Sequence, residues 1–381
     1  GARLVGRIGN WDLGFIDMQT DESIDLPSEN FGLLRVRRRV LNENSSIGTL
    51  LTSRVGRDGS YNYSYGLDGT IRAYDNDYLT VDWAQTFDDE TVKQRNARMM
   101  DLSRFRFSWE KRTAVGFSYE ASLSRNGLHF EPGMGFTPRV NYTRVGDRLS
   151  FGWLGDESSS LQSGNVALLG STIWNNQTKS LESLEAASEC VLNFKSGNFT
   201  LFGIRIFQED VIEAFNLSDD ATVPVGRYNY YSVYGFYQSP AGSDTRVAVT
   251  LNVGRLYDGS RVSFILQPAW NVSQFLELTS EYNFTRAAFE SRNEIFLSHI
   301  GRLRVRANAS TQLSASAFVQ YSNTAHALTL NMRIRYNPRE GNDFFIVYNE
   351  GLNTEGEKGL PVPPRTSDRT LLLKYSYTFV L

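Results

Sequence analysis

The chain alternates large apolar residues with small or polar ones, and its last eight residues, 374–381, show this pattern most clearly. Successive side chains of a β-strand point to opposite faces, so this run would form a strand with one polar and one apolar stripe. An exposed apolar strand invites aggregation in a soluble protein, whereas an outer-membrane barrel pairs its strand edges and turns one face to lipid. We therefore expect a lipid-facing barrel strand, and a strand tucked into a soluble β-sandwich remains the alternative. The expected lipid-facing residues are Tyr375, Tyr377, Phe379 and Leu381.

The same alternation recurs along most of the chain, for example over residues 104–109 and 117–123. We count about 20 such runs, most followed by a turn signal, which is the pattern of antiparallel strands joined in sequence order. The runs share no repeat sequence, which disfavours solenoids and propellers. The pattern thus predicts an all-β protein, a transmembrane antiparallel up-and-down β-barrel with about 20 strands in this chain and more in the full protein.

Arginines occupy the polar positions of several expected strands, opposite apolar faces that are long and continuous. In a barrel these arginines would line a hydrated lumen. There they would either pair with carboxylates and fill the interior, which we favour, or tune the passage of anions or hold a plug. The candidates are Arg35, Arg37, Arg39, Arg104, Arg106, Arg302, Arg304, Arg306, Arg333 and Arg335.

The connections between the runs are of two kinds. Short turn signals lie at 9–10, 146–147 and 196–198, and longer polar segments lie at 88–98, 209–226 and 351–367. Short turns at one rim and longer loops at the other are typical of outer-membrane barrels. Residues 88–98 and 178–189 could each hold a short helix. Residues 130–136 (FEPGMGF) break the alternation, and we interpret them as a bend or an inward-folded loop rather than a ligand site.

Composition adds further limits. The 381 residues carry a net charge of −3, which argues against a nucleic-acid partner held by phosphate neutralisation. Mean hydropathy is −0.35, and no apolar run is long enough for a transmembrane helix. Barrel strands alternate in polarity, so ordinary mean hydropathy is compatible with a membrane barrel. Cys190 is the only cysteine, so there is no intrachain disulfide and no cysteine-ligated zinc site.

Catalytic and metal-binding motifs are nearly absent from the sequence. The three histidines, His129, His299 and His326, lack the spacing of metal ligands. The acidic runs at 88–90 and 219–220 lack the pattern of a dedicated calcium loop, and we interpret them as solvated loop charge. We therefore expect no cofactor, no metal site and no assignable catalytic residue.

Residues 6–20 (GRIGNWDLGFIDMQT) and 30–38 (NFGLLRVRR) resemble a Gram-negative barrel family of unknown function. Residues 130–136, 343–351 (DFFIVYNEG) and 374–381 resemble its patterns as well. The family commonly follows an N-terminal carbohydrate-binding domain of the family-9 type. The resemblance implies that residues 1–381 are the C-terminal portion of one outer-membrane barrel, with earlier strands and any such domain upstream. It implies no functional residues.

These observations favour a protein of the bacterial outer membrane that acts in transport or cell-surface assembly, with glycan recognition by the upstream domain. Its expected partners are outer-membrane lipid, the barrel-assembly machinery and envelope proteins or glycan, but not nucleic acid. One alternative is a structural scaffold of a multi-protein envelope complex. Another is a membrane-embedded hydrolase, which would need a pair such as Glu294 and His299 to converge at one rim.

Overall fold

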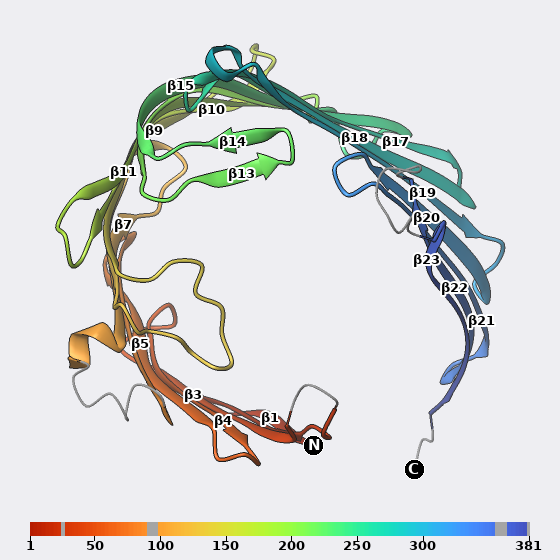
Figure 1. Cartoon of the computed structure of the whole chain (residues 1–381), viewed down its shortest axis with the longest axis horizontal. Helices are drawn as coiled ribbons and strands as arrows, with labels where there is room; N and C mark the ends of the chain where they lie inside the picture. The colour runs from red at the N-terminus through yellow and green to blue at the C-terminus, as the bar shows by residue number, and fades with distance from the viewer. Residues whose placement is uncertain (24–26, 90–97, 355–363, 379–381) are drawn as a thin grey trace. The chain divides into compact units, whose positions relative to one another are not determined.

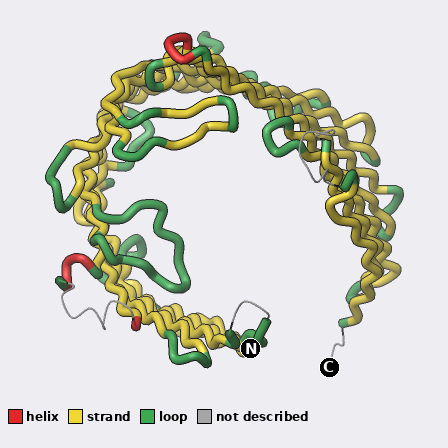
Figure 2. Tube along the Cα trace, viewed as in Figure 1, coloured by secondary structure: helices red, strands yellow, loops and turns green. Residues whose placement is uncertain are grey.

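The computed structural model describes residues 1–23, 27–89, 98–354 and 364–378, and strands dominate these ranges (Figure 1, Figure 2). Two short 3-10 turns, η1 (Met99–Asp101) and η2 (Glu290–Arg292), lie between strands. In the described residues we find no helix that has both the length and the apolar character to cross a membrane. The chain divides into two compact units: residues 1–153, 165–188 and 207–210 form unit 1, and residues 154–164, 189–206 and 211–381 form unit 2.

Unit 1 begins with nine strands, each paired antiparallel with the next strand along the chain. This is the up-and-down order that the alternation predicted. The strands are β1 (Ala2–Ile8), β2 (Trp11–Gln19), β3 (Glu29–Arg39), β4 (Ser46–Gly56), β5 (Tyr61–Tyr74), β6 (Asp77–Asp88), β7 (Ser103–Lys111), β8 (Gly116–Asn126) and β9 (Tyr142–Leu154).

The next three strands each contribute residues to both units. They are β10 (Leu161–Asn175), β11 (Leu181–Phe194) and β12 (Phe199–Val211). A short hairpin of unit 2 follows, made of β13 (Phe215–Ser218) and β14 (Ala221–Val223).

Unit 2 continues with nine long strands that again pair antiparallel in sequence order. They are β15 (Gly226–Gln238), β16 (Thr245–Leu256), β17 (Gly259–Ser273), β18 (Leu276–Phe289), β19 (Glu294–Asn308), β20 (Leu313–Ser322), β21 (Ala327–Arg339), β22 (Asn342–Asn353) and β23 (Thr366–Tyr377).

Connections at alternate strand ends differ in length within each unit. In unit 1, the connections at one set of strand ends are short, namely 9–10, 40–45, 75–76 and 112–115. The opposite ends carry three longer connections and one short turn, namely 20–28, 89–102, 127–141 and 57–60. In unit 2, the long connections 212–225 and 354–365 likewise share the same set of strand ends. The expected separation of short turns from long loops is therefore present in each unit.

Two local expectations were wrong. Gly146 and Asp147 do not form a turn but lie inside β9, where they pair with Ser122 and Ala121 of β8. Residues 181–189 belong to β11 instead of a helix, because pairing along a sheet overrides the local preference of Leu, Glu and Ala. In the other suggested helical segment, residues 90–97 lie outside the described residues.

The register gives each unit one polar and one apolar face. Along β19, Arg302, Arg304 and Arg306 share a face, and Leu303 and Val305 lie on the other. The apolar face continues across the neighbouring strands through register partners such as Met332 and Ile334, which are 43% and 41% exposed. Large side chains left uncovered over a continuous sheet face are unusual for a soluble protein and indicate an apolar environment.

The terminal strand β23 also has an apolar face with exposed large side chains. Tyr375 and Tyr377 of β23 lie on the apolar face and are 64% and 45% exposed, together with Leu371 and Leu373. Phe379 and Leu381, the other two residues of the expected stripe, lie outside the described residues.

Candidate functional site

The polar face of unit 2 carries a ladder of hydrogen-bonded charges across β16 to β20. In one row, Glu281 accepts hydrogen bonds from Arg302 at 2.5 Å and from Gln267 at 2.9 Å. Arg302 also donates to Gln320 at 2.9 Å, so this row joins four adjacent strands. Such charge-assisted bonds are stronger than neutral ones.

A second row lies four residues further along β18 and β19, and Arg246 of β16 reaches it from the register position of Ala269. Glu277 accepts a hydrogen bond from Arg246 of β16 at 3.1 Å and one from Arg306 of β19 at 3.4 Å. One carboxylate therefore binds two guanidinium groups. The arrangement pairs charged groups of the face without an apolar core, and the buried Nε of Arg246 has no hydrogen-bond partner in the described residues.

A groove of about 470 Å³ lies between these two rows. Its floor is the intermediate row, in which Ala269 pairs with Thr279 and Thr279 with Arg304. Pro268 interrupts the β17–β18 ladder beside it: the paired residues pass from Leu266 and Tyr282 directly to Ala269 and Thr279. Proline has no N–H to donate to the ladder, which accounts for the interruption.

The arginines predicted to line a lumen all lie on polar faces, and six of the ten form ion pairs with carboxylates. In unit 1, Arg37 binds Asp12 at 2.8 Å, Arg104 lies 3.9 Å from Asp82, and Arg35 pairs with Asp68. In unit 2, Arg302 and Arg306 pair as described, and Arg335 binds Asp343 at 2.5 Å. The four that form no ion pair in the described residues are Arg39, Arg106, Arg304 and Arg333.

Two of these four stack on aromatic rings. The guanidinium of Arg304 lies 5.2 Å from the ring centroid of Phe318, and that of Arg333 lies 4.5 Å from the centroid of Phe345. A cation over an aromatic face gains a modest attraction and keeps its N–H donors available. These two side chains are positioned, but their charges are not neutralised by a carboxylate.

The hairpin β13–β14 folds onto the polar face of β18 and β19 and is fixed there by Arg292. Arg292 donates to the backbone oxygen of Thr222 at 3.0 Å and to Glu294 at 3.2 Å, and it also pairs with Asp258. Glu294 in turn accepts a hydrogen bond from the Thr222 N–H at 3.0 Å. The arginine–glutamate pair thus engages both backbone polar groups of Thr222, which would otherwise be an open strand edge.

Apolar packing supports this contact. Ala221 of the hairpin lies in a buried cluster with Ala287 and Phe289 of β18, and the Arg292 guanidinium lies 4.6 Å from the Phe289 ring centroid. Burial disfavours the charged form of Arg292, but its bonds to Glu294 and Asp258 outweigh this and raise its pKa above the ordinary value. The Arg292 side chain therefore stays cationic at any physiological pH.

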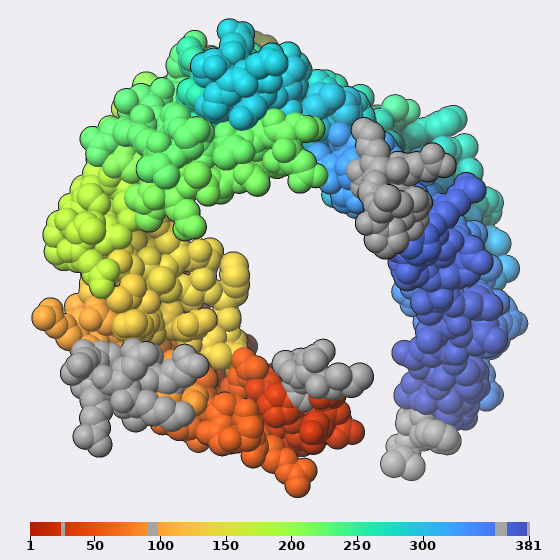
Figure 3. All heavy atoms as spheres, in the orientation of Figure 1, coloured from red at the N-terminus to blue at the C-terminus, as the bar shows by residue number. Residues whose placement is uncertain are grey.

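In unit 1, the segment 127–141 folds onto the polar face of β5 and β6, in line with the inward-folded loop expected for 130–136. Its atoms stand out as the yellow group in Figure 3. Asn62 donates to the backbone oxygen of Glu131 and accepts from the N–H of Gly133, both at 2.8 Å. A Cβ at Gly133 would lie 2.9 Å from Asn62, so glycine permits this close approach. Phe130, 4% exposed, anchors the segment.

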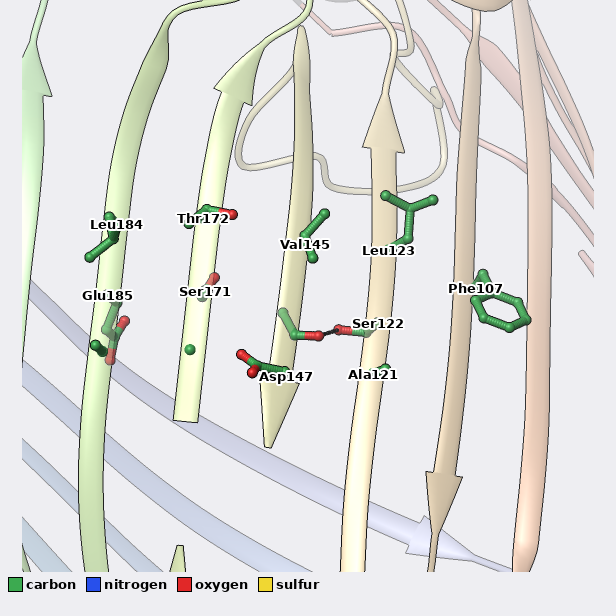
Figure 4. A pocket seen from close by; sticks show the side chains of 13 residues that line it. Phe107, Ala121, Ser122, Leu123, Val145, Asp147, Ser171, Thr172, Leu184 and Glu185 are labelled. Atoms are coloured by element: carbon green, nitrogen blue, oxygen red, sulfur yellow. Dashed lines mark hydrogen bonds between the residues drawn. The ribbon is translucent and has the colours of Figure 1, made fainter. Parts of the chain in front are cut away.

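A different recess lies on the apolar face of unit 1, around Asp147 of β9 (Figure 4). Its volume is about 620 Å³, and it arises because Ala121 and Gly170 beside Asp147 are small. The register places Asp147 in the same face as Val145 and Leu149. An exposed carboxylate in the middle of an apolar strand face departs from the alternation.

The pair of residues suggested for a hydrolase does not come together. Glu294 and His299 are an odd number of positions apart along β19, so their side chains point to opposite faces and do not converge as a hydrolase pair would need. His299 instead accepts or donates a 2.7 Å hydrogen bond with Tyr282 on the apolar face. Among the described residues, no group of three His, Cys, Asp or Glu side chains could hold a metal ion.

Sequence reasoning located the arginines but missed Arg292, Asn62 and the recess at Asp147. Arg292 and Thr222 are 70 residues apart, and no local pattern connects them. The signal for Asp147 was present as a charge flanked by Val145 and Leu149, but the preceding glycine suggested a turn instead.

Comparison with solved structures identifies the class of fold. The ferric-catecholate import receptor Fiu from E. coli K12, in its open form, matches with a TM-score of 0.52 and 10% identity over 91% of this chain and 71% of that one. The siderophore receptor PirA from Acinetobacter baumannii matches with a TM-score of 0.51 and 8% identity over 97% and 74% of the two chains. No protein-family model and no curated protein matches the sequence. The chain has the all-β, antiparallel up-and-down fold of outer-membrane barrel receptors, which confirms the predicted fold class.

Proposed function

We propose that this protein is an integral β-barrel of the bacterial outer membrane that acts in transport, with the polar faces of its strands toward an aqueous lumen. The observation that carries the proposal is the division of the same strands into two unlike faces. One face bears rows such as Gln267–Glu281–Arg302–Gln320, and the other exposes leucine, valine and tyrosine side chains. The rows suit water, and the opposite face suits lipid.

In this proposal, the ten arginines predicted from the sequence line the lumen, and Tyr375 and Tyr377 contact lipid. The six ion-paired arginines favour a filled and internally neutralised wall. The likeness in fold to an import receptor and a siderophore receptor supports transport of a solute rather than a purely structural role. Three expectations stay predictions: assembly by the barrel-assembly machinery, envelope partners, and glycan recognition by a carbohydrate-binding domain. The resemblance to the barrel family of unknown function is likewise a prediction.

Single-channel recording of the full chain in planar bilayers tests this function. We expect discrete conductance steps after insertion, because a hydrated polar face provides a path for ions. Heat-modifiable gel migration serves as the folding control. A folded, inserted protein that never conducts would instead indicate a closed structural barrel.

A further inference from the structure

The groove between the two charged rows of unit 2 contains an arginine that is not paired with a carboxylate of the described residues. Arg304 lies in the row that forms the groove floor and makes no ion pair within the described part of the chain. Its guanidinium lies over the ring of Phe318, a contact that orients the group and does not use its N–H donors. In contrast, the arginines of the rows on either side are bound by Glu281 and Glu277.

The charges that border the groove do not cancel. Arg302 and Arg304 contribute two positive charges, and Glu281 is the one carboxylate among the lining residues. Glu281 accepts a hydrogen bond from Arg302 with one oxygen and from Gln267 with the other. The lining residues therefore carry a net positive charge, and the carboxylate among them is hydrogen-bonded to Arg302 and Gln267.

The floor of the groove is open and polar. Ala269 has a small side chain, Thr279 offers a hydroxyl, and the missing β17–β18 pairs at Pro268 interrupt the ladder beside them. The volume of about 470 Å³ accommodates a small oxyanion together with part of a larger solute.

We propose that this groove binds an anionic oxygen group of a solute, that is, a carboxylate, sulfate or phosphate group. Arg304 is the principal contact, and the Thr279 hydroxyl is a second donor. Guanidinium groups match the geometry of such oxyanions and bind them by charge-assisted hydrogen bonds. The proposal rests on the proposed function in one respect, because solute reaches this groove only if the polar face borders water.

Inorganic phosphate is the probe for the test. The full chain is purified in dodecyl maltoside, and line broadening of the phosphate 31P resonance is measured against protein concentration. We expect saturable broadening for the wild type and an affinity reduced about tenfold for Arg304→Gln, since a hydrogen bond to a charged group is lost. Thr279→Val should reduce the affinity less, and Arg304→Lys should restore part of it.

Arg333→Gln is the matched control. Arg333 is also a polar-face arginine without an ion pair in the described residues, and it also stacks on a phenylalanine, but it does not line the groove. This variant should bind phosphate like the wild type. Heat-modifiable migration shows that each variant is folded. Equal binding by wild type and Arg304→Gln, or an equal loss in Arg333→Gln, would overturn the proposal.

Conductance measured on the same preparations separates this proposal from the proposed function. A chain that binds phosphate through Arg304 but never conducts overturns transport and leaves the anion site in place. A chain that conducts but binds phosphate independently of Arg304 retains transport and overturns the site.

Discussion

At the scale of single residues, position within the alternation explains most side chains, and the exceptions are the informative ones. Of the ten arginines predicted to line the lumen, six pair with a carboxylate, as Arg302 does, and two others stack on a ring, as Arg304 does. Asp147 is an exception on the opposite face, where its neighbours along β9 are Val145 and Leu149. A carboxylate placed there costs free energy if the face meets lipid.

Replacement of Asp147 by leucine should therefore stabilise the protein. We expect a gain of about 1 kcal/mol in the free energy of unfolding, since acidic residues on a lipid face cost less than basic ones. Urea unfolding in lipid vesicles, followed by heat-modifiable migration, measures this. Asp156→Leu, in the exposed turn after β9, is the control and should give no gain. A loss of stability in Asp147→Leu would contradict a lipid-facing position.

At the scale of elements, the alternation predicted the strands and their faces because it is a local property that pairing preserves. β1, β2 and the turn at 9–10 follow the sequence expectation directly. The helix suggested within 178–189 failed because Leu181–Phe194 forms a strand, so sheet pairing decided against local propensity. The docking of hairpin β13–β14 could not be predicted, because its contacts join residues about 70 positions apart.

Arg292→Ala should release the hairpin from the polar face. The substitution removes the bond to the Thr222 oxygen and leaves Glu294 and Asp258 without their cation. We expect a loss of about 1 to 3 kcal/mol in local stability, as for hydrogen bonds to charged groups. Hydrogen exchange of residues 215–223, measured by mass spectrometry, should become faster.

Arg112→Ala is the control for this change, because Arg112 is an ion-paired arginine in the exposed turn after β7. It should leave exchange at 215–223 unaltered, since exposed ion pairs contribute little. Unchanged exchange in Arg292→Ala would show that the apolar cluster of Ala221, Ala287 and Phe289 suffices to hold the hairpin.

At the scale of the whole molecule, both units obey one rule, which is antiparallel pairing in sequence order with one polar and one apolar face. The fold class followed from the sequence because about 20 runs repeat the same alternation. The expectation that further strands precede Gly1 stays a prediction. The proposed anion site did not follow from the sequence. It depends on which arginines pair with carboxylates of neighbouring strands, and the strand register determines this pairing.

Cysteine scanning along β19 tests the central claim most directly. In a Cys190→Ser background, single cysteines at 302 to 306 are exposed to a membrane-impermeant thiol reagent in outer-membrane fractions. We predict labelling at positions 302, 304 and 306 and protection at Leu303 and Val305, since the polar face borders water and the apolar face borders lipid. Uniform labelling, or labelling at 303 and 305 alone, would contradict the account.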